Sequence, residues 1–450
     1  MLPRSAPSTA DFYVKYHRHS WEASVDAVRA AVLSEDRPGF VWLETQSTDP
    51  YGSFSWLAAG APLKWHRPEH PSGAATPQDW EALVAAWRAQ PTWWLGMLSY
   101  DLKSVFEPTV PQPQNRRPEE PDFLFFEPSW VVYADAQGTW LELHPDFSRA
   151  EFDAWWAAKS GDSAAAVPFS GSPAAATRNP LVTIAPKESH YRTAAEALLE
   201  AMRQGSIYEA NLCLPWVVSG AQDVAELYVR WKERAQPPQG GCARFPGVAV
   251  VSGSPERYLQ VRGRTVRSRP IKGTAPRSAD AGADAEAVRE LSGSSKERAE
   301  NTMVVDVVRN DLSRVAIPGT VCVPQWCEVE TFPTVHQMVS TVEAQLVDQH
   351  DFWDAVAVSF PMASMTGAPK IEAMKQINAV EGFARGWYSG ALGYIRPNGD
   401  ADFNVVIRSA VVGSQVRLAA GSALTLAANP QSEWEECQLK VNPLLELVRG

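Results

Sequence analysis

Residues 390–420 read GALGYIRPNGDADFNVVIRSAVVGSQVRLAA, and this stretch decides the fold class. Apolar residues dominate Gly390–Ile395, Phe403–Val412 and Val416–Ala420, as expected of short strands separated by turns. No helical segment lies between these strands, so the regular βαβ alternation of a doubly wound fold is missing. The stretch therefore predicts an antiparallel sheet in an α+β protein.

The preceding chain gives the same mixture of separate helices and strands. Helical spacing occurs at Trp21–Leu33, Trp80–Trp87, Glu188–Met202 and Ala285–Arg314. Strands are expected at Phe40–Leu43, Trp94–Tyr100, Phe123–Phe126, Trp130–Tyr133, Ile207–Trp216, Val248–Ser252 and Tyr258–Val261. Ser432 with Glu435 fits a capping box, which predicts that a last helix begins there.

Composition divides the chain into three regions. Residues 1–158 form an N-terminal α+β region, and residues 159–185 turn to Ala, Ser, Gly and Pro, which is typical of a linker or loop. Residues 186–450 hold most of the motifs discussed below, and we expect them to form the catalytic region.

Composition and charge exclude several classes. The 450 residues are 45% hydrophobic and 21% charged, with a formal net charge of -11. An acidic chain without a basic cluster is not typical of nucleic-acid binding, and an anionic substrate would need a positive pocket or a metal. No apolar run has the length of a signal peptide or a membrane span, so we expect a cytoplasmic protein. The 5 Cys are scattered without a C-x-x-C pair and indicate reduced thiols.

The segment Arg267–Thr274 presents a single lysine between a proline and a glycine. Pro270 fixes φ and Gly273 permits a tight turn, so Lys272 is expected at a stiff corner between strand and loop. An amine held in this way loses little entropy when it reacts, which makes Lys272 a candidate nucleophile. The alternative is an ordinary solvated surface lysine.

Two pairs of glutamates share one spacing. Glu297 and Glu300 are three residues apart, as are Glu433 and Glu436, so each pair lies on one face of a helix. Two such faces that meet would form an oxygen-only site suited to Mg²⁺. A solvated helix face gives the same pattern, so neither pair establishes a metal site by itself.

Glu256 follows a Ser-Pro turn ahead of a strand. If burial raises its pKa, this carboxyl can protonate a leaving hydroxyl as a general acid. The alternative is a turn residue paired with Arg257.

The remaining polar candidates are suited to holding a carboxylate substrate. A turn offers backbone N–H groups, and arginine binds a carboxylate through two hydrogen bonds. These candidates are His336, Thr366, Gly367, Tyr388 and Arg408. The alternatives are a hydrogen bond inside the core for His336, a plain turn for Thr366 and Gly367, and ordinary packing or a surface ion pair for Tyr388 and Arg408.

Taken in order, the motifs resemble those of the chorismate-binding enzymes, which include anthranilate, aminodeoxychorismate, isochorismate and salicylate synthases. They are Ile207–Leu212, Ser254–Arg257, Pro270–Thr274, Glu297–Leu312, Thr366–Lys370 and Ile407–Arg408. The likeness is clear from about residue 188 onward and looser before it. It implies antiparallel sheets packed face to face with helices outside, and makes residues 186–450 the chorismate-binding region.

Three positions distinguish members of this family. Lys272 stands where anthranilate synthases carry alanine, and Asn301 stands where they commonly carry histidine. The resemblance therefore favours the branch of aminodeoxychorismate synthase component I, which serves para-aminobenzoate and folate biosynthesis. Glu209 stands where these synthases often have glutamine and where isochorismate synthases have a lysine base. Anthranilate synthase component I is the nearest alternative, and a non-catalytic amino-acid-binding regulatory subunit is the other.

The resemblance implies amination of chorismate at C4. Lys272 would attack C2 while Glu256 protonates the C4 hydroxyl, and ammonia would then add at C4 and expel the lysine. The attacking amine must be neutral, and we expect Mg²⁺ and Arg408 to lower its pKa. Because no glutaminase-type cysteine motif is found, ammonia is expected from a separate glutamine amidotransferase subunit or from free ammonium.

The resemblance also assigns binding roles. Glu300 and Glu436 match direct Mg²⁺ ligands, and Glu297 and Glu433 match residues that hold metal-bound waters. The substrate-binding positions are Thr274, His336, Thr366, Gly367, Tyr388, Arg408 and Gly421. The run Ala420–Ala423 replaces a more glycine-rich run of the family, and we expect Ala423 to crowd the carboxylate pocket.

Overall fold

The computed structural model describes residues 16–45, 51–52, 54–113, 115–160, 181–220 and 222–449. The greater part of the expected linker at 159–185 lies outside these residues. Strands of the N-terminal region pair with strands of the expected catalytic region, since β2 (Phe40–Thr45) pairs with β9 (Gln239–Phe245) and β4 (Trp94–Leu98) pairs with β17 (Ala391–Ile395). The two regions therefore share one sheet system.

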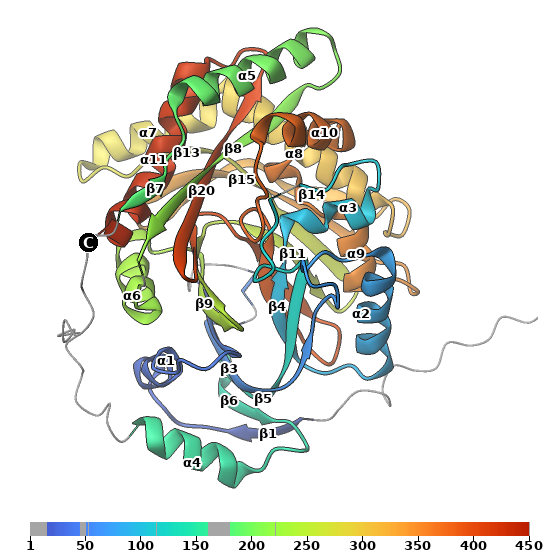
Figure 1. Ribbon diagram of the computed structural model, residues 1–450, viewed down its shortest axis with the longest axis vertical. Helices are drawn as coiled ribbons and strands as arrows, with labels where there is room; N and C mark the ends of the chain where they lie inside the picture. The colour runs from blue at the N-terminus through green and yellow to red at the C-terminus, as the bar shows by residue number, and fades with distance from the viewer. Residues whose placement is uncertain are drawn as a thin grey trace, which may run out of the picture.

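The described strands pair only in the antiparallel sense, in one continuous order that folds back into two facing layers (Figure 1). The first layer holds β8 (Glu209–Ser219), β20 (Gln415–Thr425), β19 (Ser409–Val412), β10 (Val248–Ser254), β9 (Gln239–Phe245), β2 (Phe40–Thr45) and β3 (Trp56–His66). The order continues through β5 (Phe123–Asp135), β4 (Trp94–Leu98), β17 (Ala391–Ile395), β18 (Ala401–Val405), β11 (Arg257–Arg262), β12 (Thr265–Arg269) and β15 (Val335–Gln345). The predicted α+β class with facing antiparallel sheets is confirmed.

Short strands extend this order at its edges. β13 (Ile271–Pro276) and β14 (Cys322–Thr331) both pair with β15. β7 (Val182–Ile184) and β16 (Gly367–Ala368) pair with β8, whereas β6 (Gly138–Leu143) joins β5 and β1 (His17–Ser20) joins β6.

Helices cover the outer faces of both layers (Figure 1). α1 (Val25–Leu33), α4 (Arg149–Ser160), α5 (Glu188–Arg203), α6 (Val224–Ala235), α10 (Lys370–Glu381) and α11 (Pro430–Arg449) lie on the first layer. α2 (Pro77–Ala89), α7 (Ala281–Gly293), α8 (Ser295–Ser313) and α9 (Phe352–Ser359) lie on the second. The short helices are α3 (Lys103–Phe106), η2 (Tyr100–Leu102) and η3 (Ala363–Met365).

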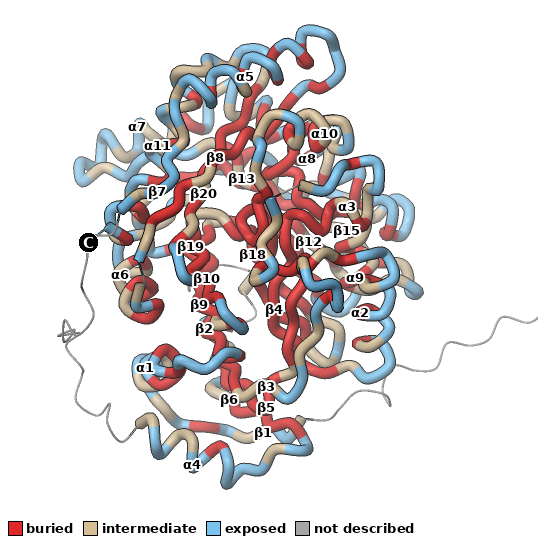
Figure 2. Tube along the Cα trace, in the orientation of Figure 1, coloured by how far each residue is buried: buried red, intermediate tan, exposed pale blue. Residues whose placement is uncertain are grey.

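The strands are apolar on both faces because each layer is covered on both sides. Val250 of β10 and Leu392 of β17 belong to the core between the layers. Their neighbours Val251 and Ala391 face the cores under the helices. Alternate side chains of a strand point to opposite faces, so both faces must be apolar here. Buried residues accordingly run along the strands, and exposed residues lie on the outer helices (Figure 2).

Two predicted elements are divided in the structure. The expected helix Ala285–Arg314 is split at Ser294, which ends α7 and whose hydroxyl accepts the N–H of Glu297 as the cap of α8. The expected strand Phe403–Val412 is split because the chain leaves β18 in the second layer and enters β19 in the first. The crossing is made through Arg408, whose φ is +51°.

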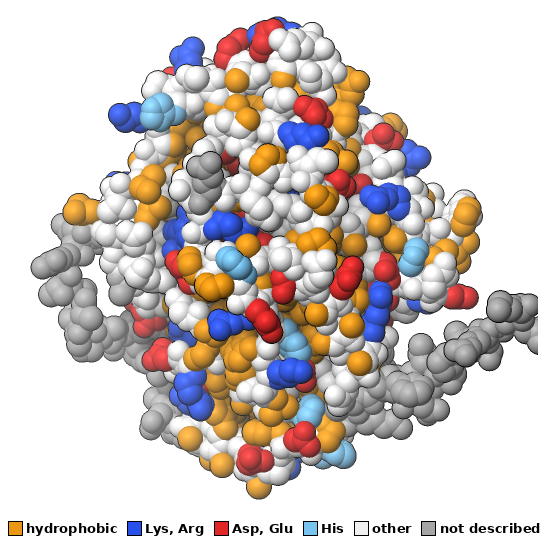
Figure 3. All heavy atoms as spheres, turned by 45° about the vertical axis from the view of Figure 1, so that its right-hand side comes forward, with side chains coloured by type: hydrophobic (Ala, Val, Ile, Leu, Met, Phe, Trp, Pro, Cys, Tyr) orange, Lys and Arg blue, Asp and Glu red, His pale blue; other side chains and the backbone are white. Residues whose placement is uncertain are grey.

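Two other boundaries differ from expectation. The predicted capping box at Ser432 is wrong, because α11 begins at Pro430 and the Asn429 side chain accepts the N–H groups of Gln431 and Ser432. The expected strands Phe123–Phe126 and Trp130–Tyr133 form one strand, β5. None of the described helices is both long enough and apolar enough to cross a membrane. On the face shown in Figure 3, acidic and basic side chains are interspersed, and the basic side chains do not gather in one patch.

Trp353 should contribute strongly to stability, because its ring contacts Trp80, Trp94 and Phe125 at centroid distances of 5.5, 5.9 and 5.5 Å. Trp353→Ala leaves a large cavity and should lower the free energy of unfolding by about 3–5 kcal/mol in urea titrations. Trp326→Ala is the matched control, since Trp326 is 52% exposed, and should cost less than about 1 kcal/mol. Equal losses for the two variants would contradict the packing described here.

Candidate active site

A cavity of about 370 Å³ opens between α8, α11, β13 and β20. This volume is within the range of about 300–1,000 Å³ usual for small-molecule sites. The cavity gathers most of the predicted site residues: Glu256, Lys272, Thr274, Glu297, Glu300, Tyr388, Arg408, Gly421, Glu433 and Glu436. Side chains distant in the sequence therefore face one space.

Lys272 is directed into the cavity by an irregularity in β13. The register between β13 and β15 shifts between Ile271 and Thr274, which is the pattern of a β-bulge. Gly273 has φ of +89°, and a Cβ at this position would lie 2.9 Å from Glu297 Oε2. Glycine is thus required both by the backbone and by the close approach of α8. Lys272 was expected at a corner between strand and loop, but it lies at a bulge within β13.

The Lys272 amine is surrounded by carboxylates. Its Nζ donates to Glu209 Oε1 at 2.7 Å, and both side chains are buried. Burial acts to lower the pKa of Lys272, but Glu209, Glu300 and Glu256 together raise it above the ordinary value. The pKa of Lys272 is therefore raised overall, where a lowered value was expected, and Arg408 is not among the groups that act most strongly on the amine.

Glu256 occupies the turn between β10 and β11 and is 4% exposed. Burial raises its pKa to about 7, against the opposing effects of Ser364 and the Lys272 ammonium. A carboxyl with this pKa carries a proton in a large share of molecules at neutral pH, so Glu256 can act as a general acid. The prediction that Glu256 is a general acid depended on burial raising the pKa of this carboxyl, and burial does raise it here.

The glutamates of α8 and α11 meet at one end of the cavity. Burial raises the pKa of Glu300 to about 7 and also raises the pKa of Glu433. Burial acts in the same direction on Glu436, but its ion pair with Lys440 lowers the pKa overall. Lys296 lies between the helices, with its Nζ 3.2 Å from Glu433 Oε1 and 3.8 Å from Glu300 Oε1.

This end of the cavity has ligands that suit a hard cation. Glu300 Oε1 is buried and accepts no hydrogen bond. In the described part of the chain, no three His, Cys, Asp or Glu side chains converge closely enough to hold a metal as they stand. Lys296 instead supplies the positive charge between Glu300 and Glu433. An oxygen-only group in which Glu300 Oε1 accepts no hydrogen bond has the type of ligand that Mg²⁺ prefers, provided that Lys296 gives way.

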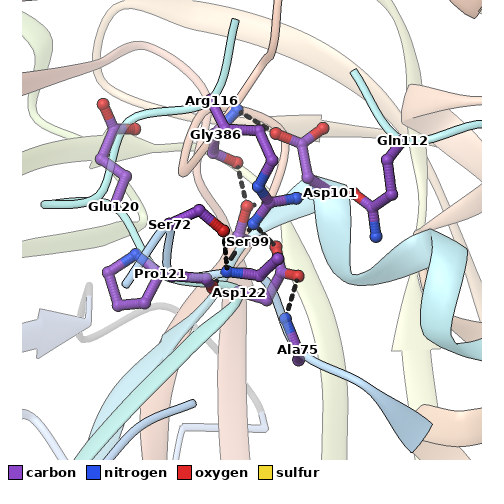
Figure 4. A network of polar contacts seen from close by, with 12 residues as sticks. Ser72, Ala75, Ser99, Asp101, Gln112, Arg116, Glu120, Pro121, Asp122 and Gly386 are labelled. Atoms are coloured by element: carbon purple, nitrogen blue, oxygen red, sulfur yellow. Dashed lines mark hydrogen bonds and ion pairs between the residues drawn. The ribbon is translucent and has the colours of Figure 1, made fainter. Parts of the chain in front are cut away.

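The turn just ahead of Tyr388 is held by residues of the N-terminal region, and Figure 4 shows Gly386 of this turn among them. Asp101 Oδ2 accepts the N–H of Gly386 at 3.0 Å, and Glu120 Oε2 accepts the N–H of Trp387 at 2.9 Å. The turn is therefore fixed at two consecutive backbone groups just ahead of Tyr388. Burial raises the pKa of Tyr388, so its phenol remains protonated near neutral pH.

Arg408 enters the cavity where the chain changes layers. Its left-handed backbone is held by the indole N–H of Trp231, which donates to the Arg408 carbonyl at 2.9 Å. A Cβ at Gly253 would lie 2.0 Å from Trp231 Nε1, so only glycine leaves room for this indole. The guanidinium shares the cavity with Tyr388, as expected of a carboxylate-binding pair.

Three predicted substrate-binding residues lie outside the cavity lining. His336 is 1% exposed, and its ring nitrogens contact Thr331 Oγ1 at 3.0 Å and Asp284 Oδ1 at 2.9 Å. The Thr366 hydroxyl is also buried and donates to main-chain carbonyls. Gly367 lets β16 approach β8, since a Cβ there would lie 2.2 Å from the Glu209 carbonyl. Their substrate contacts stay predictions.

Several cavity residues were missed from the sequence. They are Asn211, Lys296, Gln337, Ser364, Leu439 and Lys440. Lys296 and Lys440 could have been identified from the sequence, because each lies four residues from a glutamate of the acidic pairs. A lysine and a glutamate at this spacing interact on a helix. The others carry no local pattern that would mark them.

Comparison with known families and proteins agrees with this site. Residues 46–446 match the family described as chorismate binding enzyme. The chain belongs to this family.

The chain is also 37% identical over 367 residues to aminodeoxychorismate synthase from Streptomyces griseus, which covers 79% of this chain and 50% of that protein. It is 32% identical to aminodeoxychorismate synthase component 1 from Salmonella typhimurium, over 78% of this chain and 75% of that protein. The chain thus spans only about half the length of the Streptomyces relative. Anthranilate synthase component I from Streptococcus pneumoniae shares the fold, with a TM-score of 0.69 at 19% identity over 99% of this chain and 94% of that chain.

The raised pKa of Glu256 should appear in the pH dependence of stability. Because the folded protein disfavours the ionised carboxyl, the contribution of Glu256 to the free energy of unfolding should fall as pH rises from about 4.5 to about 7, by at most about 3 kcal/mol. Glu256→Gln should lack this contribution in urea titrations across that window, while the contribution of Glu300, whose pKa burial also raises to about 7, should remain. The exposed Glu435→Gln should follow the wild-type profile, and an unchanged profile for Glu256→Gln would contradict the burial effect.

Proposed function

We propose that the protein aminates chorismate at C4 and produces 4-amino-4-deoxychorismate, the reaction of aminodeoxychorismate synthase. The observation that carries this proposal is that the amine of Lys272 and the protonatable carboxyl of Glu256 line the same cavity. A nucleophile and an acid facing one space suit a displacement that is divided into two steps.

In the first step, neutral Lys272 attacks C2 of chorismate with its nitrogen lone pair. The ring double bonds shift, the C4–O bond breaks, and Glu256 donates the proton with which the hydroxyl leaves as water. Ammonia then bonds to C4, the double bonds shift back, and the electron pair of the C2–N bond returns to Lys272. The new C4 ammonium gives a proton to Glu256, which restores the acid.

The rest of the cavity is proposed to hold the two carboxylates of chorismate. Arg408 and Tyr388 offer a guanidinium and a phenol for one of them. Glu297, Glu300, Glu433 and Glu436 would hold Mg²⁺, which when bound supplies the positive charge for a substrate carboxylate. This arrangement explains how a chain of net charge -11 accepts a dianion.

Ammonia is proposed to come from a separate glutamine amidotransferase. The Salmonella relative carries "component 1" in its name, which supports a two-component arrangement in which this chain acts on chorismate. We place the reaction in the para-aminobenzoate branch of folate biosynthesis in the cytoplasm. Chorismate amination at C4 by the protein itself, with free ammonium, is the part that can be tested on the isolated chain.

Lys272→Ala should abolish most of this activity, because the displacement then lacks its nucleophile. With chorismate, ammonium and Mg²⁺, the wild type should form 4-amino-4-deoxychorismate in a chromatographic assay, and the variant should be slower by at least about 100-fold. Lys187→Ala, outside the cavity, is the control and should match the wild type. Anthranilate as the wild-type product would overturn the assignment, and so would a variant as fast as the wild type.

Glu300→Gln should weaken the response to Mg²⁺, because it removes the negative charge of a buried carboxylate whose Oε1 accepts no hydrogen bond. A ligand that binds only the folded state stabilises it, by about 2.7 kcal/mol at 100 times its Kd. Millimolar Mg²⁺ should therefore raise the melting temperature of the wild type, and that of Glu300→Gln much less. Glu435→Gln on the exposed side of α11 should respond as the wild type does. An equal Mg²⁺ shift in wild type and Glu300→Gln would refute the metal assignment.

A further inference from the structure

Arg385 is a buried arginine that lies behind the wall of the cavity. It is 3% exposed and is not one of the residues that line the cavity. Its side chain is bound by Glu381 at the end of α10, because Nε donates to Glu381 Oε2 at 2.9 Å and Nη2 donates to Glu381 Oε1 at 2.6 Å. Two parallel hydrogen bonds of this kind fix the orientation of a guanidinium. Glu381 therefore holds the plane of the Arg385 side chain in place.

Other N–H groups of Arg385 bind the main chain of two residues that line the cavity. Nη1 donates to the Met365 carbonyl at 2.8 Å, and Nη2 donates to the Asn211 carbonyl at 2.8 Å. Met365 ends η3 and Asn211 belongs to β8. Glu381 Oε1 also accepts the N–H of Cys213 on β8 at 2.8 Å. The ion pair between Arg385 and Glu381 thus joins β8, η3 and α10 directly behind the cavity.

The same guanidinium contacts the turn that leads to Tyr388. Arg385 lies three residues before Tyr388, and its Nη1 donates to the hydroxyl of Ser389, the residue after Tyr388, at 3.4 Å. From the N-terminal region, the ring of Tyr100 packs against the guanidinium, with 4.2 Å between the ring centroid and Cζ. The cavity residues that Arg385 holds, directly or through this turn, form the arginine-held wall: Asn211, Met365 and Tyr388.

We propose that Arg385 is a positioning residue of the amination, because the arginine-held wall sets where chorismate lies relative to Lys272. C2 of the substrate must reach the Lys272 amine while the C4 hydroxyl reaches Glu256. The proposed contact of Tyr388 with a carboxylate orients the same molecule. A misplacement of about 1 Å can lower the rate of such a reaction about 100-fold. This role rests on the proposed amination and adds to it a residue that does not touch the substrate.

Lysine cannot take over this role. The guanidinium binds Glu381 with two nitrogens and still donates to carbonyls on two different elements. A lysine ammonium carries the same charge, but its three N–H groups are on a single nitrogen and it has no planar fork. Arg385→Lys therefore keeps a positive charge beside the buried Glu381 carboxylate and loses the hydrogen bonds that hold the wall. This substitution separates charge from positioning.

Arg385→Lys should slow the reaction of bound chorismate. With protein in saturating excess over chorismate, and with ammonium and Mg²⁺ present, the first-order rate constant of product formation should fall by at least about tenfold. This rate constant belongs to the bound complex, so a smaller folded fraction alone would leave it unchanged. Arg88→Lys is the matched control and should react as the wild type does, because the Arg88 fork binds Asp351 and Asp354 between α2 and α9, outside the cavity.

A second variant tests whether the guanidinium group itself is needed. Guanidinium ion at about 20 mM, far below the molar concentrations that unfold proteins, should raise the rate constant of Arg385→Ala by at least about fivefold, because the ion can bind between Glu381 and the two carbonyls. Methylammonium has no planar fork and should not restore the rate. A wild-type rate constant for Arg385→Lys would overturn the proposal, as would the absence of any effect of guanidinium on Arg385→Ala.

Failure of the amination itself would look different. In that case wild-type protein would form no 4-amino-4-deoxychorismate, although the amide hydrogen of Cys213, which Glu381 accepts, would still exchange faster with deuterium in Arg385→Lys. If only the role of Arg385 is wrong, the wild type remains active, Lys272→Ala is inactive, and Arg385→Lys keeps the rate constant of the wild type.

Discussion

The ion pair between Lys272 and Glu209 is the contact on which the site depends, because it joins opposite ends of one folded sheet. β8 and β13 are separated by nearly the whole order of strand pairing, and they meet only because the sheet folds back on itself. Two glycines make the meeting possible. Gly273 adopts a left-handed backbone beside α8, and Gly367 lets β16 lie against β8. The reactive amine is therefore placed by the geometry of the whole sheet.

Charge balance explains how such a site forms in an acidic protein. Glutamates from α8 and α11 converge at one end of the cavity, and two lysines of the same helices neutralise part of their charge. Burial also raises the pKa of Glu256 to about 7, so this carboxyl can carry a proton near neutral pH. At the other end, the N-terminal region fixes the turn that presents Tyr388, so both halves of the chain contribute to one cavity.

The sequence predicted what depends on local pattern and missed what depends on packing across the layers. Short apolar runs separated by turns and the absence of βαβ units identified the α+β class. The spacing of the glutamates on α8 and α11 predicted that each pair shares a helix face, and all four line the cavity. The ion pair of Lys272 with Glu209 and the position of His336 beside Asp284 follow from long-range packing that no local spacing encodes. The last helix was predicted to begin at Ser432, but it begins at Pro430 because the Asn429 side chain caps it.

The most direct test of the central claim is to trap the covalent intermediate. Wild-type protein mixed with chorismate and Mg²⁺ in the absence of ammonium, then quenched in acid and digested, should yield a peptide with Lys272 heavier by chorismate less one water. Ammonium added before the quench should remove this adduct and give 4-amino-4-deoxychorismate in equal amount. Product formation without any adduct on Lys272, or an adduct on a different side chain, would contradict the account.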